Sequence, residues 1–73
     1  MEDNKLNNIR LQIGKLISDR REELNLSQQD LADKTTYKLA TIKAIEQGKF
    51  WIDLKQYIVI CSILNFWPQI DLG

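Results

Sequence analysis

Hydrophobic residues recur along the first third of the chain with the spacing of an amphipathic helix. From Leu6 onward they fall on one side of a helix, at Ile9, Ile13, Leu16 and Ile17. The pattern predicts a helix that begins near Leu6 and continues through the charged residues 20–23, and Asn25 suits a left-handed stop. Residues 1–5 carry no apolar pattern, and we expect them to fray.

A short second helix is predicted directly after this stop. Ser27 and Asp30 have the spacing of a capping box, in which each side chain bonds the backbone amide of the other residue. Leu31 and Ala32 follow and are expected to face the core. Residues 35–38 then form a turn, although they include neither Gly nor Pro.

A third helix is predicted over residues 39–47, with Ile42 and Ile45 directed inward and Gly48 as its stop. Two short helices joined by a tight turn form a helix-turn-helix unit, whose second helix can lie in the major groove of DNA. The stretch that begins at Ser27 therefore indicates a small DNA-binding regulator.

The last predicted helix begins at a second capping box, Asp53 with Gln56, and spans residues 54–64 before a stop at Asn65. Its apolar residues form two stripes, Leu54, Ile58, Cys61 and Leu64 on one and Tyr57, Ile60 and Ile63 on the other. A helix that is apolar on two sides is buried on two sides, and we expect the second burial to be against another subunit. The expected dimer contacts are Ile63, Phe66 and Trp67.

Size and composition restrict the class of protein. At 73 residues we expect one domain, residues 1–73, with 66–73 as a short C-terminal tail. One cysteine, Cys61, permits no intramolecular disulfide, and we expect it to be a core residue. Without histidine we expect no metal, no cofactor and no enzymatic activity. The polar N-terminus and the short apolar runs predict a cytoplasmic protein with no signal peptide and no membrane partner.

Ten basic and ten acidic residues give a net charge of zero, which weighs against nucleic-acid binding because a basic balance is its usual footprint. The distribution of the charges matters more than their sum. Between Gln28 and Lys55 there are five lysines and four acids, and two of these acids, Asp30 and Asp53, belong to the capping boxes. The lysines are sufficient for a modest basic face with weak electrostatic affinity.

Several short sequences between Ile13 and Phe66 occur in a characteristic order and spacing. They are Arg20-Arg21, Leu26-Ser27-Gln28-Gln29-Asp30-Leu31-Ala32, Thr41-Ile42, Ile45-Glu46-Gln47-Gly48-Lys49 and Ile63-Leu64-Asn65. With them the chain resembles the phage repressor/Cro-like helix-turn-helix family, also called the xenobiotic-response-element family. The resemblance implies an all-α fold, a compact bundle of four to five helices around a central helix-turn-helix, like the lambda repressor DNA-binding domain. It also implies double-stranded DNA as the partner.

The resemblance further implies which residues contact DNA. Gln28, at the start of the second helix, and Lys49, directly after Gly48, match positions that contact phosphates, and a helix N-terminus suits a phosphate oxygen. The outward face of the third helix matches the positions that meet base edges and flanking phosphates: Lys38, Leu39, Ala40, Thr41, Lys43 and Ala44. Arg21 and Glu46 match an ion pair that links the first helix to the third.

The chain departs from the family pattern at three places. Thr36 stands where the turn usually has glycine, and a left-handed conformation costs threonine about 1–2 kcal/mol. Lys38 stands where a small capping residue is common. Leu39, Ala40 and Ala44 replace long side chains that read bases by hydrogen bonds, and they can contact only a thymine methyl. The polar residues left on this face are Lys38, Thr41 and Lys43. Base readout depends on them, or on thymine methyls and DNA shape.

Two functions from different classes remain open. The first is a homodimeric, sequence-specific DNA-binding transcription regulator that places helix 39–47 in the major groove. The second is a protein-interaction module or antitoxin-like partner protein with weak or no sequence-specific DNA binding, which the zero net charge and the apolar C-terminal tail favour. An antitoxin or restriction-controller type of protein would combine both activities.

Overall fold

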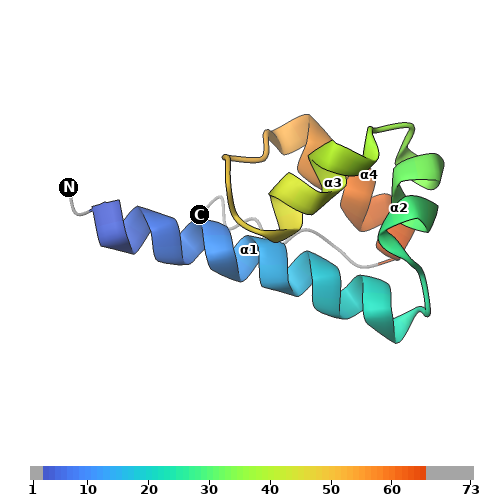
Figure 1. The fold of residues 1–73 in the computed structure, drawn as a ribbon, viewed down its shortest axis with the longest axis horizontal. Coiled ribbons are helices and arrows are strands. Elements are labelled where there is room, and N and C mark those ends of the chain that lie inside the picture. The colour runs from blue at the N-terminus through green and yellow to red at the C-terminus, as the bar shows by residue number, and fades with distance from the viewer. Residues whose placement is uncertain (1–2, 66–73) are drawn as a thin grey trace, which may run out of the picture.

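The computed structural model describes residues 3–65, which form four α-helices and no β-strand. The helices are α1 (Asp3–Glu23), α2 (Gln28–Thr35), α3 (Leu39–Glu46) and α4 (Leu54–Leu64). The long helix α1 runs along one side of the molecule, and the three shorter helices lie together against its middle and C-terminal part (Figure 1). The arrangement confirms the predicted all-α helical bundle. Two of the expected dimer contacts, Phe66 and Trp67, lie outside the described residues.

The first helix begins earlier than the hydrophobic pattern predicted. It starts at Asp3, three residues before the predicted start at Leu6. This stretch contains neither Gly nor Pro, so nothing in its sequence interrupts a helix. The first turns of α1 project beyond the other three helices (Figure 1).

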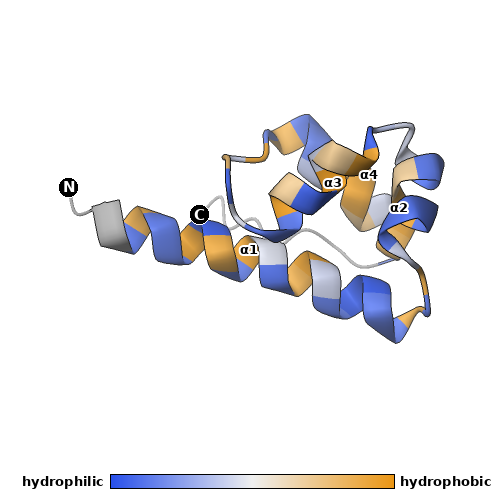
Figure 2. Ribbon diagram, viewed as in Figure 1, coloured by the Kyte–Doolittle hydropathy of each residue, from blue (hydrophilic) through white to orange (hydrophobic). Residues whose placement is uncertain are grey.

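The core consists of aliphatic side chains from all four helices. Its fully buried members are Ile17, Leu31, Ile42, Ile60 and Leu64. Ala32 and Ile45 are almost completely buried, which confirms the predicted inward positions of α2 and α3. In Figure 2 the last turns of α1 and most of α2 are hydrophilic, whereas α4 carries broad hydrophobic sections. The fold is therefore held together mainly by α3 and α4 against one face each of α1 and α2.

The predicted apolar stripes of α1 and α4 are only partly buried within the chain. Cys61 and Leu64 are buried, but Leu54 and Ile58 of the same stripe are 60% and 44% exposed. α4 packs against α1 and α2 mainly through its C-terminal half, which carries the buried residues Ile60, Cys61 and Leu64. Two residues of the α1 stripe are also exposed, Ile9 and Leu16.

Both predicted capping boxes are present. The Ser27 hydroxyl accepts a hydrogen bond from the Asp30 N–H at 2.9 Å, and the Asp30 carboxylate accepts one from the Ser27 N–H at 2.9 Å. The bond from the Ser27 N–H lowers the pKa of Asp30 because it stabilises the ionised carboxylate. Asp53 and Gln56 make the same reciprocal pair at the start of α4, at 2.7 and 3.1 Å.

Four residues with positive φ stand at helix ends. Asn25 and Asn65, the predicted stops of the first and last helices, both have φ of 60°. Gly48 has φ of 70° just after α3, and Thr36 has φ of 65° at the end of α2. Thr36 therefore adopts the left-handed conformation that the family's turn glycine adopts at lower cost.

The buried Cys61 behaves as a core residue, since desolvation raises the pKa of its thiol. Within residues 3–65 no group of Cys, Asp and Glu side chains could hold a metal ion. The helices in this same range are all too short or too polar to cross a membrane.

Candidate nucleic-acid interface

The helix-turn-helix consists of α2, the turn at residues 36–38 and α3. Thr35 is buried at the end of α2, where its hydroxyl donates to the Leu31 carbonyl at 2.8 Å and accepts the Tyr37 N–H at 3.3 Å. Tyr37 itself packs against the core. Thr36 is therefore held in its left-handed conformation between two anchored neighbours, which is how the turn forms without glycine.

The third helix turns its apolar side inward and leaves the predicted DNA-contacting side toward solvent. Ile42 and Ile45 are buried, whereas Lys38, Ala40 and Lys43 are exposed. The other predicted contact positions of this helix are partly buried, namely Leu39, which packs against the core, Thr41 and Ala44. The structure therefore exposes three of the predicted positions, leaves the other three partly buried and packs Leu39 against the core.

Lysines lie at both ends of α3 as well as in its middle. Lys38 precedes the helix with an extended backbone, φ −71° and ψ 149°, and its side chain makes no capping hydrogen bond. Beyond Gly48, the exposed Lys49 donates its N–H to the Ala44 carbonyl at 3.0 Å. Together with Lys43, these residues place three exposed cations along one short helix.

A buried polar network joins α3 to α1. Arg21 donates from Nε to Glu46 Oε2 at 2.8 Å and from Nη2 to Oε1 at 3.2 Å, which is a bidentate pair. Only 11% of the Arg21 side chain and 6% of the Glu46 side chain are exposed. The hydrogen bonds to Glu46 raise the pKa of Arg21. Arg21 also donates to the Leu26 carbonyl at 2.7 Å, so it fastens the α1–α2 connection to the same point.

The same network holds Gln28, the predicted phosphate contact at the first position of α2. Its Nε2 donates to Glu46 Oε1 at 3.0 Å. A primary amide has two N–H groups, so the bond to Glu46 orients the side chain and engages one of them. No local pattern signals this bond, because the two residues are 18 positions apart in the chain.

Gly14 lies where α1 and α3 are in close contact, and no motif in the sequence marked it as a site residue. A Cβ atom at this position would lie 2.5 Å from the Glu46 carbonyl oxygen and 2.6 Å from that of Ile45. These distances are too short for any side chain, so glycine permits the approach that brings Glu46 to Arg21. The available signal was a glycine inside an otherwise regular helical pattern.

Arg20 also has a structural role that its sequence pattern did not predict. Its Nε donates to the Leu64 carbonyl at 2.9 Å and its Nη2 to the Asn65 carbonyl at 3.3 Å. Carbonyl groups at the end of a helix have no partner within the helix, so Arg20 satisfies the C-terminus of α4.

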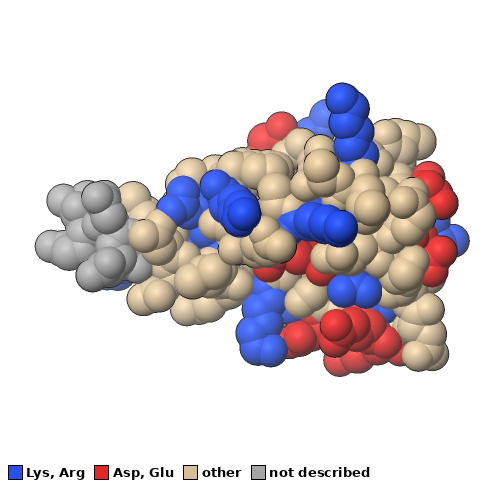
Figure 3. Space-filling view, in the orientation of Figure 1, with Lys and Arg blue, Asp and Glu red and all other residues tan. Residues whose placement is uncertain are grey.

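Ion pairs are distributed unevenly over the described part of the chain. The ion pairs of the described residues all involve the second half of α1: Lys15–Asp19, Arg20–Glu23, Arg21–Glu22 and Arg21–Glu46. The remaining cations of residues 3–65 form no ion pair within this range: Lys5, Arg10, Lys34, Lys38, Lys43, Lys49 and Lys55. In Figure 3 acidic groups gather along the C-terminal turns of α1 and at the α2 edge, while basic groups extend across the middle of the molecule. A net charge of zero therefore coexists with a basic face.

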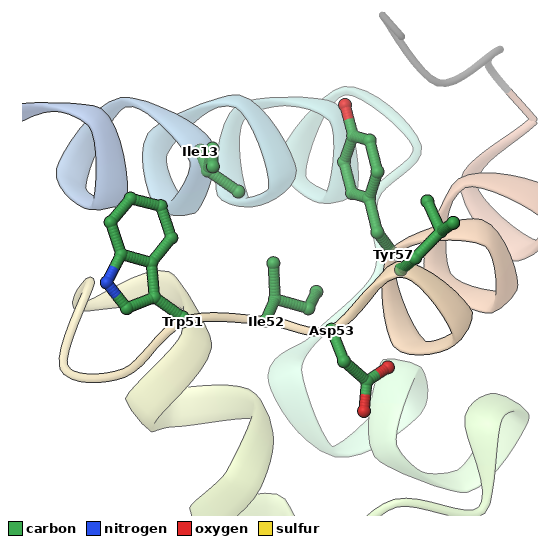
Figure 4. Close-up of a pocket in the computed structure, with 6 residues that line it drawn as sticks. Ile13, Trp51, Ile52, Asp53 and Tyr57 are labelled. Atoms are coloured by element: carbon green, nitrogen blue, oxygen red, sulfur yellow. The ribbon is translucent and has the colours of Figure 1, made fainter. Parts of the chain in front are cut away.

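A hollow of about 340 Å³ lies between α1, the α3–α4 loop and the start of α4 (Figure 4). Its lining residues are Ile13, Trp51, Ile52, Asp53, Leu54 and Tyr57. The carboxylate in this set, Asp53, is engaged in capping α4, and the other lining side chains are mostly apolar. The hollow therefore contains no pair of groups suited to acid–base chemistry.

A family model described as helix-turn-helix matches residues 17–66, which is more than half of the chain. No curated protein and no solved structure shows significant similarity to the chain. The matched region contains α2, the turn, α3 and α4, together with the part of α1 that carries Arg21. The chain therefore belongs to the helix-turn-helix family of DNA-binding regulators of the phage repressor/Cro type.

Proposed function

We propose that this protein is a cytoplasmic transcription regulator of the repressor type, which binds double-stranded DNA as a homodimer with α3 in the major groove. The observation that carries the proposal is the exposed side of α3, where Lys38 and Lys43 are exposed and form no ion pair with the described residues. Glu46, the acidic residue of this helix, is turned inward to Arg21, so it does not repel a phosphate on that side.

Phosphate contacts are expected to supply most of the affinity. Lys38, Lys43 and Lys49 are exposed and can follow one stretch of DNA backbone along the length of α3. Gln28 adds a neutral contact, because the Glu46 carboxylate fixes one N–H of its amide and leaves the other for a phosphate oxygen. Affinity from these contacts falls steeply with salt, since each one releases counterions from the DNA.

Base recognition is expected to depend on few hydrogen bonds. Thr41 has a hydroxyl that can donate or accept, while Ala40, Ala44 and the partly buried Leu39 offer only apolar contact. The apolar positions suit thymine methyl groups in the major groove. We expect an operator in which thymines face this part of α3.

A two-fold dimer would place two copies of α3 in successive major grooves about 34 Å apart. We propose Ile63, Phe66 and Trp67 as dimer contacts. Ile63 packs partly against the core and is not fully exposed. The exposed Leu54 and Ile58 of α4 support an apolar contact on this helix.

The test of this function is a charge reversal on α3. We expect Lys43→Glu to abolish binding to a selected operator while the thermal midpoint stays nearly unchanged, because Lys43 is exposed and unpaired. Fluorescence anisotropy with labelled duplexes and thermal unfolding measure the two effects. The matched control is Lys34→Glu, the same change at an exposed position of α2. Equal binding by Lys43→Glu and the wild type would refute the assignment of α3.

A protein-interaction module or antitoxin-like protein is the second candidate. Exposed apolar side chains on the α3–α4 loop and α4 favour it, namely Trp51, Leu54 and Ile58. Sedimentation equilibrium with and without a pool of random duplexes at low salt separates the candidates. Association with DNA that is reversed by salt supports the transcription regulator. A monomer or dimer that does not bind DNA supports the protein-interaction module.

A further inference from the structure

The α3–α4 loop lies directly against the first half of α1. Gly48 has φ of 70°, and a Cβ atom on it would lie 3.0 Å from Leu11 Cδ2 and 3.1 Å from the Arg10 carbonyl carbon. The loop backbone therefore touches α1 at Arg10, and the next residue in the loop is the exposed Lys49. This contact brings the backbone of Gly48, the residue before Lys49, against the backbone of Arg10.

Two further contacts hold the Arg10 side chain. Its Cζ lies 5.6 Å from the centre of the Trp51 ring, within the range of a cation–π interaction. Its Nη2 donates to the Asn7 side-chain oxygen one turn earlier in α1. The guanidinium is thus oriented by an aromatic ring and a neutral amide, and neither contact neutralises its charge.

Nothing in the described part of the chain compensates Arg10 and Lys49. Neither residue forms an ion pair within residues 3–65, and the Arg10 Nε is buried there without a hydrogen-bond partner. The carboxylates of α1 that form ion pairs lie in its second half, where they bind Lys15, Arg20 and Arg21. An anion placed beside Arg10 and Lys49 would interact favourably with both positive charges.

We propose that Arg10, held by Trp51, binds a DNA phosphate next to the one contacted by Lys49, and so extends the DNA contact along α1. The inference rests on the proposed function, because the phosphate belongs to the same DNA duplex that α3 is proposed to bind. A guanidinium stacked on an aromatic ring keeps its edge N–H groups available, and those groups match the geometry of a phosphate. Arg10 precedes the family match, which begins at residue 17, so the family pattern does not supply this contact.

The experiment measures the dependence of the binding constant on salt for the full chain with one duplex. We expect Arg10→Gln to make the slope of log K against log salt shallower by about one, and to weaken binding to specific and random duplexes by the same factor. Lys49→Gln should have the same effect, and in the double variant the slope should become shallower by about two. The matched control is Lys15→Gln, whose lysine is already paired with Asp19 on the same helix.

A second variant separates positioning from charge. Trp51→Leu keeps every cation but removes the ring that holds Arg10, so we expect weaker binding with a nearly unchanged salt slope. Thermal midpoints of all variants show whether each remains folded. If Lys43→Glu loses DNA and Arg10→Gln keeps the wild-type slope, the second phosphate contact is refuted while the function stands. If Lys43→Glu binds as well as the wild type, both proposals fail.

Discussion

The two helices of the helix-turn-helix have the same length but are held in place by different means. α2 has its capping box at Ser27 and Asp30 and a left-handed stop at Thr36, so both of its ends are settled by residues within a few positions. α3 has no side-chain cap at Lys38, and its other end combines a local stop at Gly48 with contacts to α1. Since isolated helices of eight residues are unstable in water, neither forms alone, but α3 depends more strongly on the rest of the fold.

This difference makes the position of α3, the helix proposed to contact DNA, depend on α1. Glu46 at the end of α3 is bound by Arg21, and the backbone at the same point passes over Gly14. Because Glu46 also orients Gln28, one buried carboxylate sets the position of both predicted DNA-contacting helices. We therefore expect substitutions in α1 to change DNA binding without touching DNA.

The largest expected effect comes from removing that carboxylate. Glu46→Ala leaves the buried Arg21 charge without its partner, which typically costs about 3–5 kcal/mol of unfolding free energy. We expect the lower end of this range, because Arg21 keeps its bond to the Leu26 carbonyl. Denaturant unfolding measures the loss.

The control for this variant is Glu23→Ala, which breaks an ion pair whose carboxylate is well exposed. Its pair with Arg20 is expected to contribute less than about 1 kcal/mol. Similar losses for the two variants would show that the link between α1 and α3 is no stronger than a surface pair, and the contrast between α2 and α3 would disappear.

The next effect concerns the close approach of α1 and α3. Alanine gains about 1 kcal/mol over glycine inside a helix, but at Gly14 its Cβ would overlap the backbone of Glu46, and overpacking costs about 1–3 kcal/mol. We expect Gly14→Ala to lose stability overall and to weaken DNA binding by displacing α3. Gln12→Ala, at an exposed position of α1, is expected to change stability by less than about 0.5 kcal/mol. A stabilised Gly14→Ala protein would contradict the close packing.

The smallest expected effect comes from adding a side-chain cap to α3, which would make its N-terminus resemble that of α2. Lys38→Ser should supply the missing cap of α3, because the backbone at this position already has the extended conformation of an N-cap residue. We expect a gain of about 1 kcal/mol in unfolding free energy together with weaker DNA binding, since one exposed cation is lost. Calorimetry and anisotropy on the same sample test both parts. A gain in stability without any loss of affinity would remove Lys38 from the DNA-binding set.

Much of the fold was predictable because its signals are local. The capping boxes at Ser27 and Asp53 and the stop at Asn65 lie where the residue pattern placed them, since each depends on bonds within a few positions. The start of α1 at Asp3 was missed because polar residues without an apolar neighbour can extend a helix without leaving a hydrophobic pattern. The exposure of Leu54 and Ile58 was missed because periodicity defines a face and not its neighbours.

The candidate site also has a part that was predictable from the sequence and a part that was not. The residue pattern and the family resemblance placed Lys38, Lys43 and Lys49 on or beside one short helix, and the structure leaves all three exposed. Neither indicated that Gln28 is tied to Glu46, that Arg20 caps α4, or that Trp51 holds Arg10. The hydrogen bonds among these contacts join residues 18 to 45 positions apart, so no local spacing encodes them.

Sequence alone was enough for the order of the helices, their caps and stops, and the membership of a family that contacts DNA. These features follow from hydrophobic period, from side chains that bond the nearest backbone groups, and from a motif of fixed spacing. Packing in three dimensions was required to show which cations remain unpaired, how closely α3 lies on α1, and which loop meets Arg10. The reason is physical: the energy of a buried ion pair or a backbone contact depends on distance in space, and chain separation does not reveal that distance.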